Sequence, residues 1–188
     1  MSPHTFSVLI VSANPRLQGV LPAILARESM LVHQGSVRSP FEALARAVVD
    51  APDIVLSDLP PANVHEVLTW RALREQGSHL VMLTRYLHEG DDLRAVLAGA
   101  AGLILVPERR LLDSILRAAT GDLLRSEELN GRLSAIVSGE APSPLDGGER
   151  RVLGLIAEGH TDAEIASRLN VSLGDVRDQI VRITEKLG

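Results

Sequence analysis

The sequence predicts an α/β protein with a doubly wound, five-stranded parallel sheet, followed by a small all-α domain. Two patterns predict this fold. Short apolar runs alternate with segments of helical spacing as far as residue 119, as expected for strands that are buried on both faces of a parallel sheet. After residue 149, apolar residues recur only at helical spacing. Because the chain contains only 2 Phe, 1 Trp and 1 Tyr, we expect both cores to be aliphatic.

The predicted strands are apolar runs bounded by polar or turn residues. Four runs are nearly continuous, at residues 7–11, 53–57, 79–84 and 102–106, and a weaker run at 32–37 supplies the fifth strand. Helical stripes fill the gaps, and they begin at Leu17, Phe41, Val64 and Leu93. Two further helices are predicted at 111–119 and 126–137. Alternating strands and helices favour a doubly wound open sheet.

Functional residues of such sheets lie at the carboxyl ends of the strands. In this chain these places are Ser12 to Asn14, Asp58 to Pro61, Thr84 to Tyr86, and Val106 to Pro107.

Three segments are predicted along the chain. Residues 1–122 form the α/β domain, residues 123–144 a linker helix and a flexible linker, and residues 145–188 the helical domain. The linker is predicted from the stretch SGEAPSPLDGG at 138–148, which is rich in Gly, Pro and Ser.

The composition of the chain excludes several kinds of site and function. The chain has no cysteine, which excludes disulfides and thiolate metal sites. We expect a cytoplasmic protein without membrane contact, because no secretory leader and no apolar stretch of about 18 residues is present. The formal net charge of -5 means that any nucleic-acid contact must come from a local basic face. Lys186 is the only lysine, so arginine supplies almost every positive charge.

The last 40 or so residues predict a helix-turn-helix. Thr161 and Glu164 have the spacing of a capping box that begins a helix. After a short turn at Asn170 and Val171, Ser172 is a predicted N-cap with Asp175 in the third position. Two capped helices separated by so short a turn are typical of DNA-binding proteins.

The stretch LDGGERRVLGLIAEGHTDAEIASRLNVSLGDVRDQIVRITEKLG at 145–188 resembles the LuxR-type DNA-binding domain of two-component response regulators. AEG, EIA, RLNVS and EKLG are in register with that family. The resemblance implies a transcription regulator that binds DNA, a homodimer, and a sensor kinase or another regulator protein as a further partner. The positions that it implies for DNA contact are Thr161, Ser172, Gly174, Asp175, Arg177, Asp178 and Arg182.

The predicted DNA face departs from the family pattern, which places basic and neutral polar residues there. Asp175 and Asp178 would repel phosphates, although Arg177 and Arg182 could reach a phosphate or a guanine edge. Family members also continue into a fourth helix that helps these domains to pair, whereas the sequence ends at Gly188. Pairing through this domain is therefore left open.

The first 120 or so residues are similar in layout to the receiver domain of the same regulators. Asp58, at the end of the third predicted strand, matches the phosphoacceptor aspartate, and Thr84 matches the hydroxyl residue that follows the fourth strand.

Other receiver positions differ. Ser12 and Ala13 stand where the family has the two acidic residues that hold magnesium, and Val106 stands where it has a lysine. Leu103 occupies the aromatic switch position. Without carboxylates a magnesium ion binds weakly, and phosphoryl transfer depends on that ion.

We therefore predict a non-enzymatic regulator whose degenerate pocket acts without phosphorylation, metal or cofactor. In this interpretation Asp58 caps a loop and Thr84 is a structural hydroxyl. Two alternatives stay open: a protein-interaction regulator that has lost DNA binding, and a conventional response regulator that is phosphorylated on Asp58.

Overall fold

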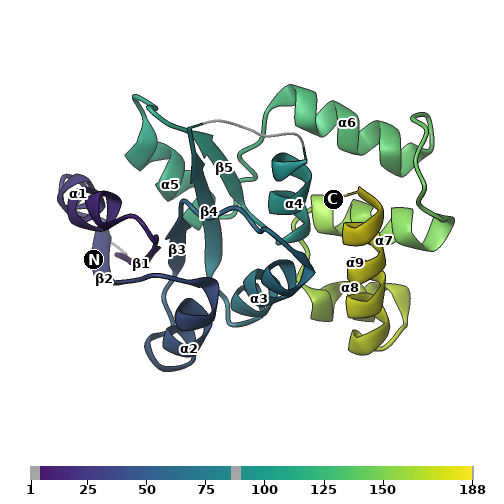
Figure 1. Cartoon of the computed structure of the whole chain (residues 1–188), viewed down its shortest axis with the longest axis horizontal. Helices are drawn as coiled ribbons and strands as arrows, with labels where there is room; N and C mark the ends of the chain where they lie inside the picture. Colours follow the sequence, from purple (N-terminus) through teal and green to yellow (C-terminus); the bar gives the residue numbers. More distant parts are fainter. Residues whose placement is uncertain (1–4, 86–89, 188) are drawn as a thin grey trace.

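A parallel sheet forms the centre of the N-terminal part in the computed structural model, which describes residues 5–85 and 90–187 (Figure 1). The strands are β1 (Phe6–Val11), β2 (Leu31–Val37), β3 (Ile54–Ser57), β4 (His79–Thr84) and β5 (Gly102–Leu105). Their order in the sheet is β2-β1-β3-β4-β5, and all neighbours are parallel. The predicted doubly wound sheet is confirmed, including its weaker second strand.

Helices cover both faces of this sheet. One face carries α1 (Pro15–Leu25) and α5 (Leu111–Ala119), and the other carries α2 (Pro40–Asp50), α3 (Val64–Glu75) and α4 (Asp91–Leu97). Trp70 of α3 is fully buried between the sheet and the helices of this second face, so the expectation of an aliphatic core is wrong for this part of the chain. The buried cluster of the C-terminal helices is aliphatic, as expected. We call β1 to α5 the sheet region.

The C-terminal part is helical, as predicted. It contains α6 (Glu127–Ser138) and then α7 (Gly147–Ala157), α8 (Asp162–Leu169) and α9 (Leu173–Leu187), and we call the last three helices the headpiece. Asp146 begins α7 through a capping box with Glu149. In the described ranges, none of the helices combines the length and the apolarity that crossing a lipid bilayer requires.

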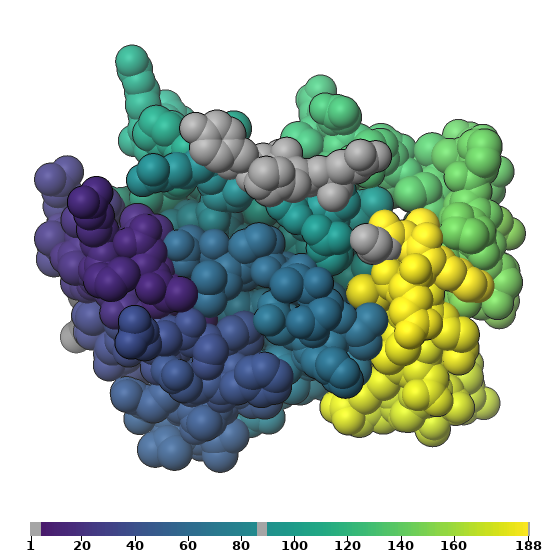
Figure 2. All heavy atoms as spheres, viewed as in Figure 1, coloured from purple at the N-terminus to yellow at the C-terminus, as the bar shows by residue number. Residues whose placement is uncertain are grey.

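The headpiece packs directly against the sheet region. Val67 of α3 and Leu93, Val96 and Leu97 of α4 belong to the same hydrophobic cluster as the apolar residues of α6 to α9. Figure 2 shows the atoms of α9, in yellow, against those of α3, in blue. The division of the chain at 1–122, 123–144 and 145–188 stays a prediction.

Candidate functional site

The predicted pocket residues come together at one edge of the sheet. Val11 pairs with Ser57, so Ser12 and Asp58 follow at the same level on neighbouring strands. Thr84 pairs with Leu105 in the same way, and the Val106 amide donates a 2.7 Å hydrogen bond to the Thr84 carbonyl. The parallel register alone accounts for the proximity of these residues, because strands that run in one direction end at the same edge of the sheet.

Ser12 is used to shape the loop that follows β1. Its side chain is buried, and its Oγ accepts a 3.1 Å hydrogen bond from the Asn14 amide. Asn14 in turn caps α1 by accepting a hydrogen bond from the Arg16 amide, 3.0 Å. Ala13 is exposed and carries no ligating side-chain atom. The loop therefore brings no carboxylate to the place where the receiver resemblance expects two.

Asp58 has an unusual environment for a carboxylate. Its Oδ1 is buried and has no hydrogen-bond partner in the described part of the chain. The interpretation of Asp58 as a loop cap is wrong, because the Leu59 amide donates to Ser57 Oγ instead, at 3.0 Å. Burial of an oxygen without a partner costs about 1–3 kcal/mol. Among the described residues, no group of three or more His, Cys, Asp or Glu side chains could hold a metal ion.

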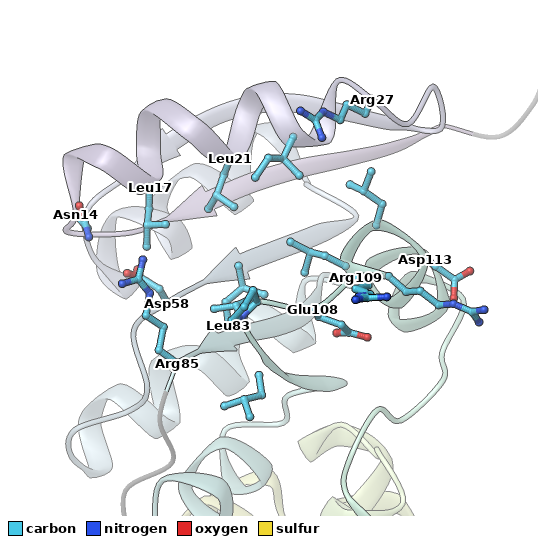
Figure 3. A pocket seen from close by; sticks show the side chains of 17 residues that line it. Asn14, Leu17, Leu21, Arg27, Asp58, Leu83, Arg85, Glu108, Arg109 and Asp113 are labelled. Atoms are coloured by element: carbon cyan, nitrogen blue, oxygen red, sulfur yellow. The ribbon is translucent and has the colours of Figure 1, made fainter.

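A cavity of about 1310 Å³ opens from Asp58 along the face of the sheet that carries α1 and α5 (Figure 3). Asp58 and Val106 line it, whereas Ser12, Ala13 and Thr84 do not. Tyr86, expected near the end of the fourth strand, lies outside the described residues.

Four arginines line the cavity wall: Arg27, Arg85, Arg109 and Arg110. Arg85 lies in the predicted range Thr84 to Tyr86, whereas the other three were missed by sequence reasoning. A signal was present for Arg109 and Arg110. Arg85 follows β4 directly, and the pair Arg109 and Arg110 follows shortly after β5, so all three lie just beyond the carboxyl ends of strands. Such positions are where a doubly wound sheet presents its functional side chains.

The headpiece contains the predicted caps. Thr161 and Glu164 form the predicted capping box of α8. Ser172 and Asp175 form a similar pair at α9, in which the Asp175 carboxylate accepts from the Ser172 amide at 3.0 Å and from the Ser172 hydroxyl at 2.7 Å. These hydrogen bonds lower the pKa of Asp175, the one from the hydroxyl most. Asp175 is thus a capping residue on the surface that the resemblance assigns to DNA.

The outer face of α9 is open to solvent. Gly174, Asp175 and Asp178 are exposed, and the side chains of Arg177 and Arg182 are 48% and 52% exposed. Each arginine also lies near a buried carboxylate of the headpiece. Arg177 Nε is 3.7 Å from Asp162 Oδ2, and Arg182 Nε is 3.6 Å from Glu149 Oε1. The sheet region therefore leaves both arginines accessible.

A buried polar contact joins α3 to the headpiece. The guanidinium of Arg71, which is 3% exposed, donates to the Asp162 carboxylate at the start of α8. It also donates to the carbonyl oxygens of Leu97 at 3.0 Å and His160 at 3.3 Å. Arg74, one turn further along α3, donates to the Gly159 carbonyl. Arg71 falls within the helical segment predicted from Val64, but no local pattern of the sequence indicates these contacts.

Comparison with known proteins identifies relatives of this chain. No protein-family model matches it. It is 28% identical to the transcriptional regulatory protein DesR of Bacillus subtilis, over 96% of this chain and 89% of DesR. It is 29% identical to the DNA-binding transcriptional activator DevR/DosR of Mycobacterium tuberculosis, over 96% of this chain and 88% of that protein. The homologues of this chain are response regulators of the LuxR/NarL type.

The response-regulator fold extends along the whole chain. A solved structure of two RcsB dimers bound to two parallel DNAs has a TM-score of 0.59 with this structure, at 18% identity, and covers 98% of this chain and 92% of the RcsB chain. The sheet region thus has the fold of a receiver, and the headpiece that of the helix-turn-helix domain of these regulators.

Proposed function

We propose that this chain is a cytoplasmic, DNA-binding transcriptional regulator whose receiver acts without phosphorylation and without enzymatic activity. One observation carries the proposal about the receiver: Asp58 follows β3 beside Ser12 and shares its cavity with Val106, and neither of these two side chains supplies a carboxylate for magnesium or a cation for a phosphoryl group. Ser12 is also committed to its own loop. Transfer to Asp58 would therefore lack the charges that stabilise it.

DNA binding is supported by the open face of α9 and by the relatives. DevR/DosR is a DNA-binding transcriptional activator, and the RcsB structure contains dimers on DNA. We propose that this chain likewise binds DNA as a homodimer. The proposed contacts are Thr161, Ser172, Gly174, Asp175, Arg177, Asp178 and Arg182. Asp175 and Asp178 share a helix face with Arg182 by their spacing, so binding is weaker than a fully basic helix would give.

Intact-mass spectrometry tests the phosphorylation proposal. The chain is incubated with acetyl phosphate and Mg²⁺ beside a conventional receiver that serves as the positive control. We expect no phosphoryl adduct on this chain while the control is modified. An adduct that disappears in Asp58→Asn would establish the conventional response regulator instead.

Fluorescence anisotropy with a generic DNA duplex tests DNA binding at about 50 mM and about 200 mM salt, where counterion release gives a steep salt dependence. We expect binding at the lower salt that Arg182→Ala weakens. Arg38→Ala removes an exposed arginine of the sheet region and serves as the matched control. Absence of binding at the lower salt would favour the alternative, a regulator that acts only through protein contacts.

A further inference from the structure

Helix α2 carries large apolar side chains on the side that faces solvent. Phe41, Val48 and Val49 are 60%, 69% and 81% exposed, and Ala45 between them is exposed as well. Exposed apolar residues are ordinary when they are scattered singly. These four residues instead stand at positions i, i+4, i+7 and i+8, which is the spacing of one helix face. We call them the apolar face of α2.

The core of the protein does not use this face. Ala43 and Ala47 are the residues through which α2 is buried against the sheet, and Leu44 is half-buried beside them. Figure 1 shows α2 at the edge of the molecule, with α3 between it and the headpiece. The large side chains of the apolar face therefore leave water only when another molecule covers them.

Charged residues flank the apolar face on one side. Glu42 and Arg46 are both exposed and stand four positions apart. Arg46 Nε donates to Asp50 at 2.6 Å, and the arginine side chain stays 47% exposed. Glu42 Oε2 accepts a 2.9 Å hydrogen bond from the Arg38 amide. A guanidinium has five N–H donors and a carboxylate has two oxygens, so each side chain can also pair with a charge on a neighbouring molecule.

The apolar face and its charges are self-complementary when a second copy of α2 runs in the opposite direction. With a two-fold axis beside Ala45, Phe41 of one copy lies opposite Val48 and Val49 of the other. The same axis brings Glu42 of one copy opposite Arg46 of the other, and the symmetry makes each contact twice. A parallel arrangement would instead bring Glu42 opposite Glu42. The small side chain of Ala45 at the crossing point lets the two helices approach closely.

We propose that the apolar face of α2 is a homodimer interface, in which two copies of α2 pack antiparallel about a two-fold axis at Ala45. This inference rests on the proposed function, which includes a homodimer, and it names the surface through which the copies pair. Two helices of 11 residues make a small contact, so the dissociation constant is expected on the order of 10–100 µM. At about 1 µM the free chain is then mostly monomeric, and DNA that holds two copies side by side strengthens the pairing.

Sedimentation equilibrium of the full chain without DNA, from about 5 µM to about 500 µM, tests the proposal around the expected dissociation constant. We expect the average mass to rise from that of a monomer toward that of a dimer. Phe41→Ser should weaken association at least about tenfold, because two phenylalanine side chains leave the contact. Val171→Ser changes an apolar residue of the headpiece that is 38% exposed, and it should associate as the wild type does. A wild-type chain that stays monomeric at the highest concentration would overturn the proposal, and so would equal association of Phe41→Ser and wild type.

Charge reversal tests the antiparallel direction. Glu42→Arg or Arg46→Glu alone brings like charges together twice, and each should weaken association at least about fivefold, the effect of one unit charge nearby in water. The double variant restores opposite charges and should associate more strongly than either single variant. Circular dichroism spectra show whether the three variants keep their helices. A folded double variant that associates no better than the single variants would overturn the antiparallel pairing.

A disulfide locates the two-fold axis. The chain contains no cysteine, so Ala45→Cys introduces a single thiol. A disulfide needs the two Cα atoms within about 7 Å, which holds for Ala45 and its copy only if the axis lies beside it. We expect mild oxidation to give a covalent dimer of Ala45→Cys. Ala163→Cys, at an exposed alanine of α8, should remain mostly monomeric. Equal yields of covalent dimer from the two variants would overturn the proposal.

Failure of this inference and failure of the proposed function are distinguishable. DNA binding by a chain that does not associate through α2 would overturn the interface and leave the DNA-binding regulator standing. Association through α2 without DNA binding at low salt would overturn the proposed function and leave the interface standing.

Discussion

Among the described residues, Arg71 makes the most buried polar contact between the sheet region and the headpiece. It pairs with Asp162, which is 1% exposed, and its other hydrogen bonds go to carbonyls of α4 and of the turn before α8. Removing both charges from water is costly, and the pair offsets that cost only while both partners are present. The contact therefore depends on how the two parts dock.

Replacing Arg71 tests this contact. Arg71→Met should lower the free energy of unfolding by about 3–5 kcal/mol, because the Asp162 carboxylate is then buried with only Arg177 nearby. Urea denaturation measures the loss. The control is Arg46→Met, which breaks an exposed pair with Asp50 and should cost less than about 1 kcal/mol. Equal losses in the two variants would contradict the buried contact.

The environment of Glu149 predicts that the stability of the folded protein depends on pH. Burial raises its pKa, but hydrogen bonds from Lys186 and the Asp146 amide outweigh burial, so the pKa lies below its ordinary value of 4.5. A carboxylate with a lowered pKa in the folded state stabilises the protein above pH 4.5 and loses that contribution as the pH falls through the folded value.

Glu149→Gln tests the sign. The variant should be less stable than the wild type at about pH 7, and the difference should shrink toward about pH 3, as the wild-type carboxylate takes up a proton. The urea midpoints of the variant and the wild type at the two pH values measure this difference in stability. Glu185→Gln changes an exposed residue of α9 and should match the wild type at both. A difference for Glu149→Gln that does not change with pH would refute the role of its charge.

At the scale of an element, α9 has a different role on each of its two faces. Its inner face packs Val176, Ile180 and Ile183 into the shared core, and its outer face carries the proposed DNA contacts. Asp175 on that outer face accepts hydrogen bonds from the amide and hydroxyl of Ser172, the N-cap of the helix, which accounts for an acidic residue at a position where phosphate would repel it. Asp178 has no ion pair among the described residues, so no structural role accounts for it.

These two aspartates should behave differently. Asp178→Asn should raise DNA affinity at low salt by about fivefold, the effect of one nearby unit charge in water, without a change in stability. Asp175→Ala should also raise DNA affinity but lower the free energy of unfolding, because its two hydrogen bonds from Ser172 at the start of the helix are lost. Anisotropy and urea denaturation measure the two quantities. If Asp178→Asn leaves DNA affinity unchanged, α9 does not face DNA as proposed.

At the scale of the whole molecule, one hydrophobic cluster runs from α3 and α4 into the headpiece. Trp70, the only tryptophan of the chain, is buried on α3 beside Arg71. Its fluorescence therefore reports on the sheet region next to the contact. A shared core couples the unfolding of the two parts.

Ile183→Ala tests this coupling from the headpiece side. Removing a fully buried side chain should cost about 2–5 kcal/mol. The urea transitions followed by Trp70 fluorescence and by far-UV circular dichroism should shift together. Val49→Ala, at a residue that is 81% exposed, should shift neither. A Trp70 transition that stays in place while circular dichroism shows an earlier one would mean that the two parts unfold independently.

Local patterns explain why most elements could be predicted. The strands and helices follow from periodicity, and the caps at Thr161 and Ser172 follow from residues three positions apart. The cavity could not be predicted, because Leu17, Leu21 and Ile24 have the same spacing whether they fill a core or line a space. The partner of Arg71 is 91 positions away in the chain, beyond the reach of any local pattern.

The sequence by itself determined the five-stranded fold, the capped headpiece helices, and the presence of Ser12, Ala13 and Val106 where the receiver resemblance expects two acidic residues and a lysine, since each depends on residue type and near neighbours along the chain. Tertiary structure alone decided that α3 docks on α8, that the arginines of α9 stay open, and that an apolar cavity ends at Asp58. These features depend on how separate elements pack, and the sequence of any one element does not contain that information.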